Sequence, residues 1–205
     1  MAKLIKLNNK VLSIFNKLLK WTSPYPIADE VTIGTQVWKT KNLDIDDGGE
    51  GIYKVDNVII DGINIGTQYY YTWDAANRVA ESIEGWHLPT NNELTTLRNY
   101  LGESIAGKIL KSIFGWTNDA NGTNEYGFNG EPVGYYMPTS WSDSSGTYPP
   151  GVYGLGSSVN YWGSSSYQTF GYSLQLTSNT SNKDKLMISS MTKSCLYSAR
   201  LIKDT

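Results

Sequence analysis

Residues 117–182 constrain the fold most, because they are dominated by Gly, Ser, Thr, Asn and aromatic residues, with few charges and no helical periodicity. Without a helical period, this stretch does not predict an amphipathic helix. A disordered segment would lack the aromatic residues that recur throughout it. The stretch therefore predicts long ordered loops over a sheet. Short strands are expected at 161–162, 172–176, 186–188 and 197–202.

The part of the chain before this stretch predicts one strand and several helices. Residues 31–38 alternate in part and are rich in β-branched side chains, which predicts a strand. Thr72 is placed to cap a helix over residues 73–83. A short helix is also expected over residues 104–111.

A further helix is predicted by its start and stop signals. Thr90 and Glu93 have the spacing of a capping box, in which each side chain satisfies an exposed backbone amide. Apolar residues then recur on one helical face, and Gly102 is expected to end the helix. These apolar residues are Leu94, Leu97 and Leu101.

The chain has a single cysteine, Cys195, and a single histidine, His87. An internal disulfide and a His-rich zinc site are therefore excluded. A Cys-His nucleophile would also need an orienting group. We instead interpret Cys195 as a small buried side chain and His87 as a packing residue between two large apolar neighbours. No catalytic residue, metal or cofactor is expected.

Residues 42–51 form an acidic loop with two possible roles. Its carboxylates offer oxygen ligands for calcium. The spacing of an EF-hand is absent, so a solvated acidic loop is the alternative. The carboxylates belong to Asp44, Asp46, Asp47 and Glu50.

Charge divides the chain into a basic arm and an acidic body. Residues 1–28 contain five lysines and no acid, so the rest, with 12 basic and 19 acidic residues, has a net charge of -7. We expect an arm at 1–23, a Pro-rich linker at 24–30 and a body at 31–205. A sequence pI of about 5.4 argues against nucleic-acid binding. No apolar run is long enough to span a membrane.

Two conformations of the arm stay open. Apolar residues at alternating steps of three and four predict a coiled-coil seam, made of Leu4, Leu7, Val11, Ile14, Leu18 and Trp21. The repeat of Asn-Lys-Val-Leu at 9–12 as Asn-Lys-Leu-Leu at 16–19 instead predicts a β-meander. Either form exposes apolar side chains that so short a segment cannot cover alone. The arm is therefore expected to anchor or oligomerise the protein.

Several separated motifs occur in order between residues 31 and 204. They are IGTQVW (33–38), NL (42–43), YTWDAA (71–76), GWHLPT (85–90) with Glu93, AGKILK (106–111), YGF (126–128), PVGY (132–135), YWGSS (161–165) and SARLIKD (198–204). In this order they resemble the Fibrobacter succinogenes major paralogous domain family, which is common in Bacteroidetes and their phages. The resemblance implies an α+β, C-type-lectin-like fold, with two to three helices on a small twisted, mainly antiparallel sheet and long loops forming a ligand face.

The family resemblance also bears on chemistry and location. The related formylglycine-generating enzymes use a pair of cysteines, so that activity is excluded for a chain with only Cys195. Members of the family often carry Cys where Glu84 and Leu201 stand here, and Gly where Leu196 stands. Without these cysteines or a recognisable signal peptide, the chain suits assembly in a reducing cytoplasm.

The aromatic residues fall into two sets. Those in the family-like motifs are expected in the core, namely Trp38, Trp73, Trp86, Trp116 and Trp162. Those in the Gly/Ser-rich stretch are candidates for stacking on sugars or gripping a protein, with loop pinning as the alternative. These candidate ligand-binding residues are Trp141, Tyr148, Tyr153, Tyr167, Phe170 and Tyr172.

The function expected from these features is that of a non-enzymatic phage virion protein, such as a head fibre, decoration or tail-tip subunit. Its arm would bind other virion proteins, and its body would contact a host glycan or protein. Symmetric fibres favour a homo-oligomer, with a trimer as the first guess. The alternative is a carbohydrate-binding adhesin on a bacterial cell surface.

Overall fold

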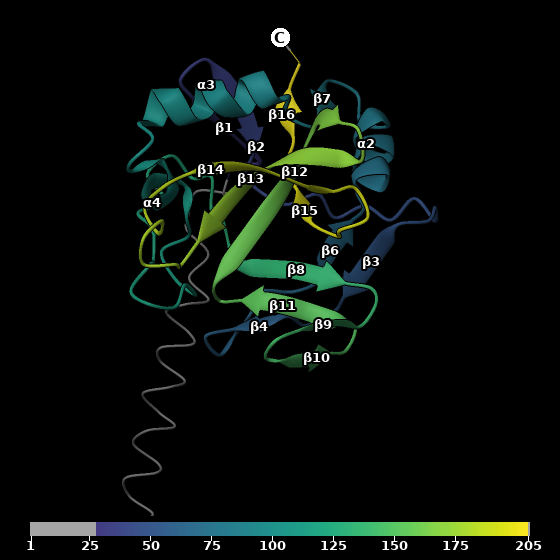
Figure 1. Cartoon of the computed structure of the whole chain (residues 1–205). Helices are drawn as coiled ribbons and strands as arrows, with labels where there is room; N and C mark the ends of the chain where they lie inside the picture. Colours follow the sequence, from purple (N-terminus) through teal and green to yellow (C-terminus); the bar gives the residue numbers. More distant parts are fainter. Residues whose placement is uncertain (1–27, 205) are drawn as a thin grey trace, which may run out of the picture.

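The computed structural model describes residues 28–204, with all of their side chains except those of Trp141 and Asp143 (Figure 1). The six predicted seam residues of the arm, from Leu4 to Trp21, lie outside the described residues. The choice between a coiled coil and a β-meander therefore stays open. No helix among residues 28–204 is long and apolar enough to cross a membrane.

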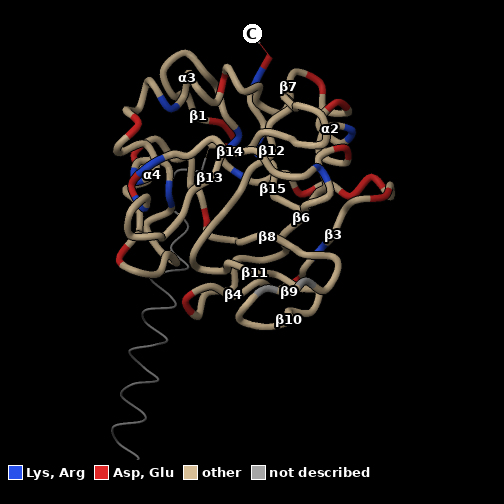
Figure 2. The backbone as a smooth tube through the Cα atoms, in the orientation of Figure 1, with Lys and Arg blue, Asp and Glu red and all other residues tan. Residues whose placement is uncertain are grey.

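A six-stranded sheet forms the centre of the molecule, and β12 is its longest strand. The strand order is β11-β8-β12-β13-β14, with β15 pairing against β12. None of these strands contains a charged residue, which Figure 2 shows as uninterrupted tan segments. The bounds are β8 (Val133–Met137), β11 (Gly151–Leu155), β12 (Ser158–Tyr167), β13 (Phe170–Thr177), β14 (Met187–Thr192) and β15 (Ser198–Ala199).

A four-stranded sheet holds the beginning and the end of the described chain together, in the order β1-β2-β16-β7. Its strands are β1 (Glu30–Ile33), β2 (Gln36–Lys39), β7 (Trp86–His87) and β16 (Ile202–Lys203). The prediction of one strand over 31–38 is wrong, because the segment turns back on itself as the β1–β2 hairpin. Gly34 makes this turn with a φ of 63°, a conformation that other residues rarely adopt.

Three two-stranded sheets complete the body. They pair β3 (Ile52–Val55) with β6 (Gln68–Tyr71), β4 (Ile59–Ile60) with β5 (Ile63–Asn64), and β9 (Trp141–Asp143) with β10 (Gly146–Tyr148). In Figure 1 the β9–β10 hairpin lies at the end of the molecule opposite α3.

The helices form where their capping signals predict. Helix α2 (Trp73–Glu81) is capped by Thr72, whose side chain accepts a hydrogen bond from the Ala75 amide. Helix α3 (Asn91–Leu101) has the predicted capping box and ends at Gly102, and its apolar face is buried. Helix α4 (Ala106–Leu110) is shorter than expected. The three helices surround the central sheet in Figure 1.

The predicted α+β, C-type-lectin-like fold class is wrong, because the body is mostly β. Strands account for 39% and helices for 14% of the structure, and the main sheet is curled. The error comes from residues 117–182, because their many glycines led to a prediction of long loops where the structure has strands. Some of these glycines lie within strands at close contacts. A Cβ on Gly163 would lie 2.6 Å from the Pro89 carbonyl oxygen, and one on Gly171 would lie 2.2 Å from the Trp73 ring.

The prediction that the motif tryptophans lie in the core is confirmed for three of the five. Trp38, Trp116 and Trp162 are buried in it. Trp73 and Trp86 are half-buried and pack against the edge of a core cluster, so they are more exposed than predicted. A lysine covers each of these rings, with Lys193 Nζ 4.0 Å from the Trp73 ring centre and Lys39 Nζ 4.0 Å from that of Trp86. Such cation–π contacts let an indole remain at the surface.

Candidate functional site

The six aromatic residues predicted to bind a ligand lie on two separate hairpin regions. Tyr148 on β10 contacts Tyr153 on β11, with ring centres 6.1 Å apart and nearly perpendicular. Tyr153 also contacts Tyr135 on β8. Both residues are half-buried, so these rings pack against one another on the sheet. Trp141 pairs with Tyr148 through the backbone, and its side chain lies outside the described part of the structure.

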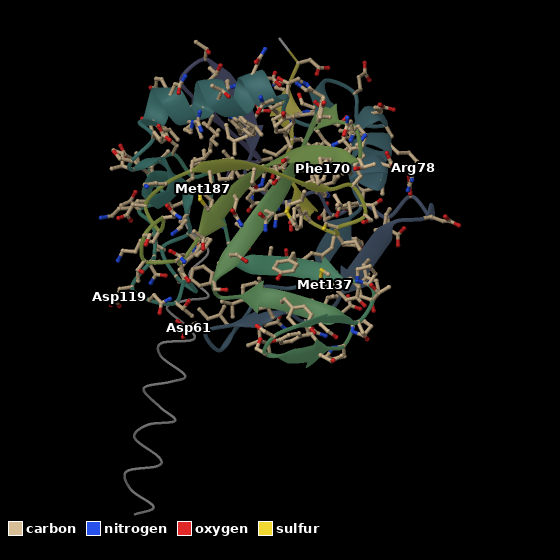
Figure 3. All side chains as sticks on the ribbon, in the orientation of Figure 1. Asp61, Arg78, Asp119, Met137, Phe170 and Met187 are labelled. Atoms are coloured by element: carbon tan, nitrogen blue, oxygen red, sulfur yellow. The ribbon has the colours of Figure 1, made fainter. Side chains whose placement is uncertain are left out.

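The other rings lie at or near the tip of the β12–β13 hairpin. Tyr167 and Phe170 face each other across the turn and are 64% and 41% exposed. Tyr172, further along β13, is half-buried. In Figure 3, Phe170 lies beside α2, far from Met137 at the end of β8. The two sets of rings therefore do not form one aromatic platform.

The acidic loop is tied to α2. The carboxylate of Asp47 pairs with Arg78, 2.8 Å from its Nε, and also accepts a hydrogen bond from the Gly49 amide. The hydrogen bond from Arg78 lowers the pKa of Asp47 to about 2. Within residues 28–204, no group of three or more His, Cys, Asp or Glu side chains is arranged to hold a metal ion.

His87 joins the C-terminal strand region to the start of α3. Its Nδ1 lies 2.6 Å from the Asp204 carboxylate, and its Nε2 lies 3.1 Å from the Glu93 carboxylate. Glu93 is also the acidic member of the capping box with Thr90. Both His87 and Cys195 are half-buried, which is more exposed than the sequence suggested.

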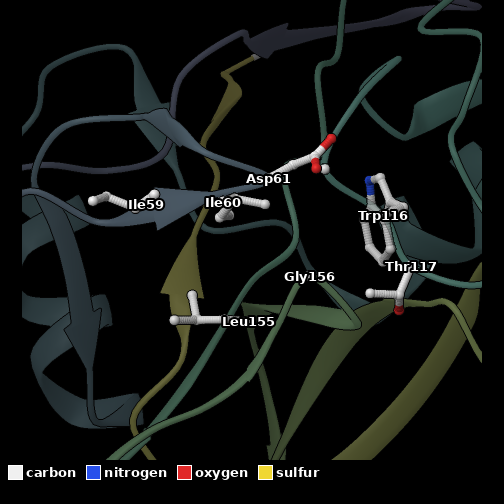
Figure 4. Close-up of a pocket in the computed structure, with 8 residues that line it drawn as sticks. Ile59, Ile60, Asp61, Trp116, Thr117, Leu155 and Gly156 are labelled. Carbon is white, nitrogen blue, oxygen red and sulfur yellow. The ribbon is translucent and has the colours of Figure 1, made fainter. Parts of the chain in front are cut away.

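A first cavity, of about 300 Å³, lies between the β4–β5 hairpin and the segment around Trp116 (Figure 4). Trp116 and Leu155 stand on opposite sides of it, and Asp61 lies at its edge. Most of its other lining is aliphatic or backbone. It therefore offers few polar groups that could orient a ligand.

A second and larger cavity, of about 640 Å³, has a lining rich in polar and charged side chains. This cavity, called here the Glu131 pocket, takes its lining from the segments 40–44, 65–69, 113–114, 124–131 and from Arg200. Its volume lies within the range typical of small-molecule sites. Its polar lining includes Asn42, Gln68, Asn124, Asn129, Glu131 and Arg200.

Glu131 and Arg200, which carry opposite charges, both line this pocket. Burial raises the pKa of Glu131, and the positive charge of Arg200 opposes this effect in part. Burial lowers the pKa of Arg200, and the charge of Glu131 is among the effects that oppose it. Perturbed groups that converge in a cavity are typical of a functional site. We therefore take this pocket, rather than the predicted rings, as the best-formed small-molecule site.

Sequence reasoning missed the Glu131 pocket because its residues are far apart in the chain. Asn42 and Arg200 lie in motifs noted above, but nothing in either motif indicates a shared cavity. Asn124, Asn129 and Glu131 belong to the stretch interpreted as loops. Backbone contacts between distant segments bring them together, such as the pairing of β2 with β16 and the bridge between Lys111 and Gly130.

Comparison with known proteins gives one positive result. The model of the Fibrobacter succinogenes major domain family matches residues 31–203. No curated protein and no solved structure matches the chain.

Proposed function

The chain belongs to the Fibrobacter succinogenes major domain family, and from that premise we propose that it is a non-enzymatic virion surface protein. In this proposal it is a head fibre, decoration or tail-tip subunit. Residues 1–23 attach it to other virion proteins and join its copies, and the body faces outward to bind the host.

The observation that carries the proposal is the exposed aromatic tip of the β12–β13 hairpin. Tyr167 and Phe170 present large rings to solvent from the end of a long antiparallel ladder. Rigid aromatic side chains on a fixed scaffold give contact area to a partner at a low cost in conformational entropy. Trp73 packs against Gly171 beside the tip and donates a hydrogen bond to the Gly163 carbonyl, which holds the hairpin in place.

The division of charge supports a separate role for the arm. Residues 1–28 carry five lysines and no acid, whereas the rest of the chain has a net charge of -7. An acidic body disfavours self-association through its own surface, and a basic arm favours an acidic partner.

The arm is tested by comparing the full chain with one that starts at Ala28. We expect the full chain to be an oligomer by light scattering and to join the particle, and the shortened chain to be a folded monomer that does not. The described sheets and core consist of residues within 28–204, so we expect circular dichroism to show unchanged folding of the shortened chain. If the shortened chain still joins the particle, the anchoring role is wrong.

If the full chain fractionates with cell envelopes and is missing from particles, the alternative function of a cell-surface adhesin is favoured instead.

The aromatic tip is tested by the double variant Tyr167→Ala/Phe170→Ala. We expect its binding to host cells to fall about tenfold or more, because large aromatic residues often dominate interface energies. The matched control is Tyr100→Ala, which removes a ring that is 57% exposed on α3. Equal loss in both variants would show that the hairpin tip is not the binding surface.

A further inference from the structure

The Glu131 pocket is lined by two chemically different sets of side chains. One set is polar and includes several amides and the carboxylate of Glu131, and the other is apolar and contains Ile65, Tyr69, Ile113 and Phe114. Ile113 is 66% exposed, so the apolar lining reaches solvent. A ligand that uses both sets must carry hydrogen-bonding groups as well as an apolar face. Sugar rings have this character, because hydroxyl groups surround a face made of C–H groups.

The hydrogen bonds already made by Arg200 limit the charge of the ligand. Its guanidinium donates to the side chains of Asn42 and Tyr161 and to the carbonyls of Lys39 and Phe128. These bonds use all five of the N–H donors that an arginine has. A phosphate or carboxylate ligand would therefore find no free donor on Arg200, although anion sites usually depend on such donors. The other cationic residue of the lining, Lys41, has a side chain that is 74% exposed and lies 3.9 Å from the Asp29 carboxylate.

The Glu131 carboxylate, in contrast, can accept more hydrogen bonds than it does. Among the described residues, only the Asn129 side chain donates to its carboxylate, at 3.2 Å. An ionised carboxylate can accept about four hydrogen bonds. The charges that line the pocket are balanced, because Arg200 and Lys41 are opposed by Glu131 and Asp44, and this balance favours neutral donors such as hydroxyl groups over a cation.

The amides beside Glu131 are only loosely engaged. Asn42 Nδ2 donates to Gln68 Oε1 at 3.4 Å, and Gln68 Nε2 donates to the Ile65 carbonyl at 3.3 Å. Both distances exceed the usual range for such bonds, so a ligand hydroxyl could replace or supplement them at low cost. Neighbouring amide donors and acceptors suit the paired hydroxyls of a pyranose.

We propose that the Glu131 pocket binds a neutral saccharide, with hydroxyl groups donating to Glu131 and the apolar face of the ring against Tyr69. The volume of about 640 Å³ accommodates a mono- or disaccharide. This site shares no residue with the tip formed by Tyr167 and Phe170 and does not depend on the proposed virion role. Its failure would leave that role intact.

The test uses the full chain and saturation-transfer NMR with the methyl glycosides of glucose, galactose, mannose and N-acetylglucosamine. We expect at least one of them to bind saturably. Glu131→Gln keeps the shape of the side chain and removes its charge, and it should weaken binding about tenfold or more, since hydrogen bonds to charged groups are the strong ones. The matched control, Glu125→Gln, changes an exposed carboxylate in the same segment and should leave binding unchanged.

Two further measurements make the outcome unambiguous. If Glu131→Gln unfolds, Tyr69→Leu serves as the second variant. It removes a half-buried ring from the apolar lining and should weaken binding by a similar factor. Inorganic phosphate and methylammonium serve as charged probes and should not compete. The proposal is overturned if no glycoside binds, if Glu125→Gln weakens binding as much as Glu131→Gln, or if a charged probe displaces the sugar.

Discussion

Replacing Lys111 with Met should lower the free energy of unfolding by about 3 kcal/mol or more. Lys111 follows α4 and has an exposed fraction of 0%. Its ammonium donates to the backbone carbonyls of Ala120, Thr177 and Lys183, and it lies 4.4 Å from the centre of the Trp116 ring. Methionine fills similar space but leaves these carbonyls without a donor, and each unpaired buried group costs about 1–3 kcal/mol.

The matched control is Lys108→Met, on the exposed face of α4. It changes the same residue type one helical turn earlier and should alter stability by less than about 0.5 kcal/mol. The free energy of unfolding of both variants is measured by urea unfolding, monitored by tryptophan fluorescence. Equal stability of Lys111→Met and the parent would mean that the segments around Ala120 and Lys183 do not depend on the buried ammonium.

The pH dependence of Lys111→Met provides a second check. Burial lowers the pKa of Lys111 to about 8, from an ordinary value of 10.5. Between these two pH values the unfolded chain holds more protons than the folded one, so this residue makes stability rise with pH in that window. We expect the stability difference between the parent and Lys111→Met to widen between pH 8 and pH 10. A constant difference would show that the pKa is not lowered.

Sequence signals predicted the parts of the fold that are determined locally. Each helix cap joins residues that are three positions apart, namely Thr90 with Glu93 and Thr72 with Ala75. Both helices start where predicted. The strand at 31–38 failed because Gly34 reverses the chain in its middle. A glycine within a partly alternating pattern allows this reversal, because it adopts a positive φ at little cost.

The fold class and the pocket depended on contacts that local patterns do not contain. Gly163 was interpreted as part of a loop, but it lies in β12, where the Pro89 carbonyl approaches it too closely for a side chain and so requires a glycine. Lys111 would be expected at the surface on residue type alone. It is buried with its ammonium bonded to three carbonyls, of which those of Thr177 and Lys183 are far away in the sequence. The Glu131 pocket forms in the same way, from segments that meet only after folding.

Arg200→Lys should be the other strongly destabilising substitution, again by about 3 kcal/mol or more. The guanidinium is fully buried between the rings of Phe128 and Tyr161, with ring centres 4.6 and 5.1 Å away. It links the Lys39 carbonyl in the four-stranded sheet to Tyr161 in the six-stranded sheet. Lysine keeps the charge but has three donors in place of five and no planar fork, so it cannot make these bonds together.

Arg200→Lys should promote local opening of the backbone around residue 200 more than it promotes global unfolding. The Lys39 amide donates to the Leu201 carbonyl and the Leu43 amide to the Ala199 carbonyl, on either side of the arginine. We expect hydrogen exchange at these two amides to accelerate most, because the guanidinium holds the two segments together. The matched control is Arg78→Lys, whose surface ion pair with Asp47 should contribute less than about 1 kcal/mol. Two results would contradict this prediction: an equal loss of stability in both variants, or unchanged exchange at Lys39 and Leu43 in Arg200→Lys. Either would mean that a positive charge alone is sufficient to join the sheets, without the five hydrogen bonds of the guanidinium.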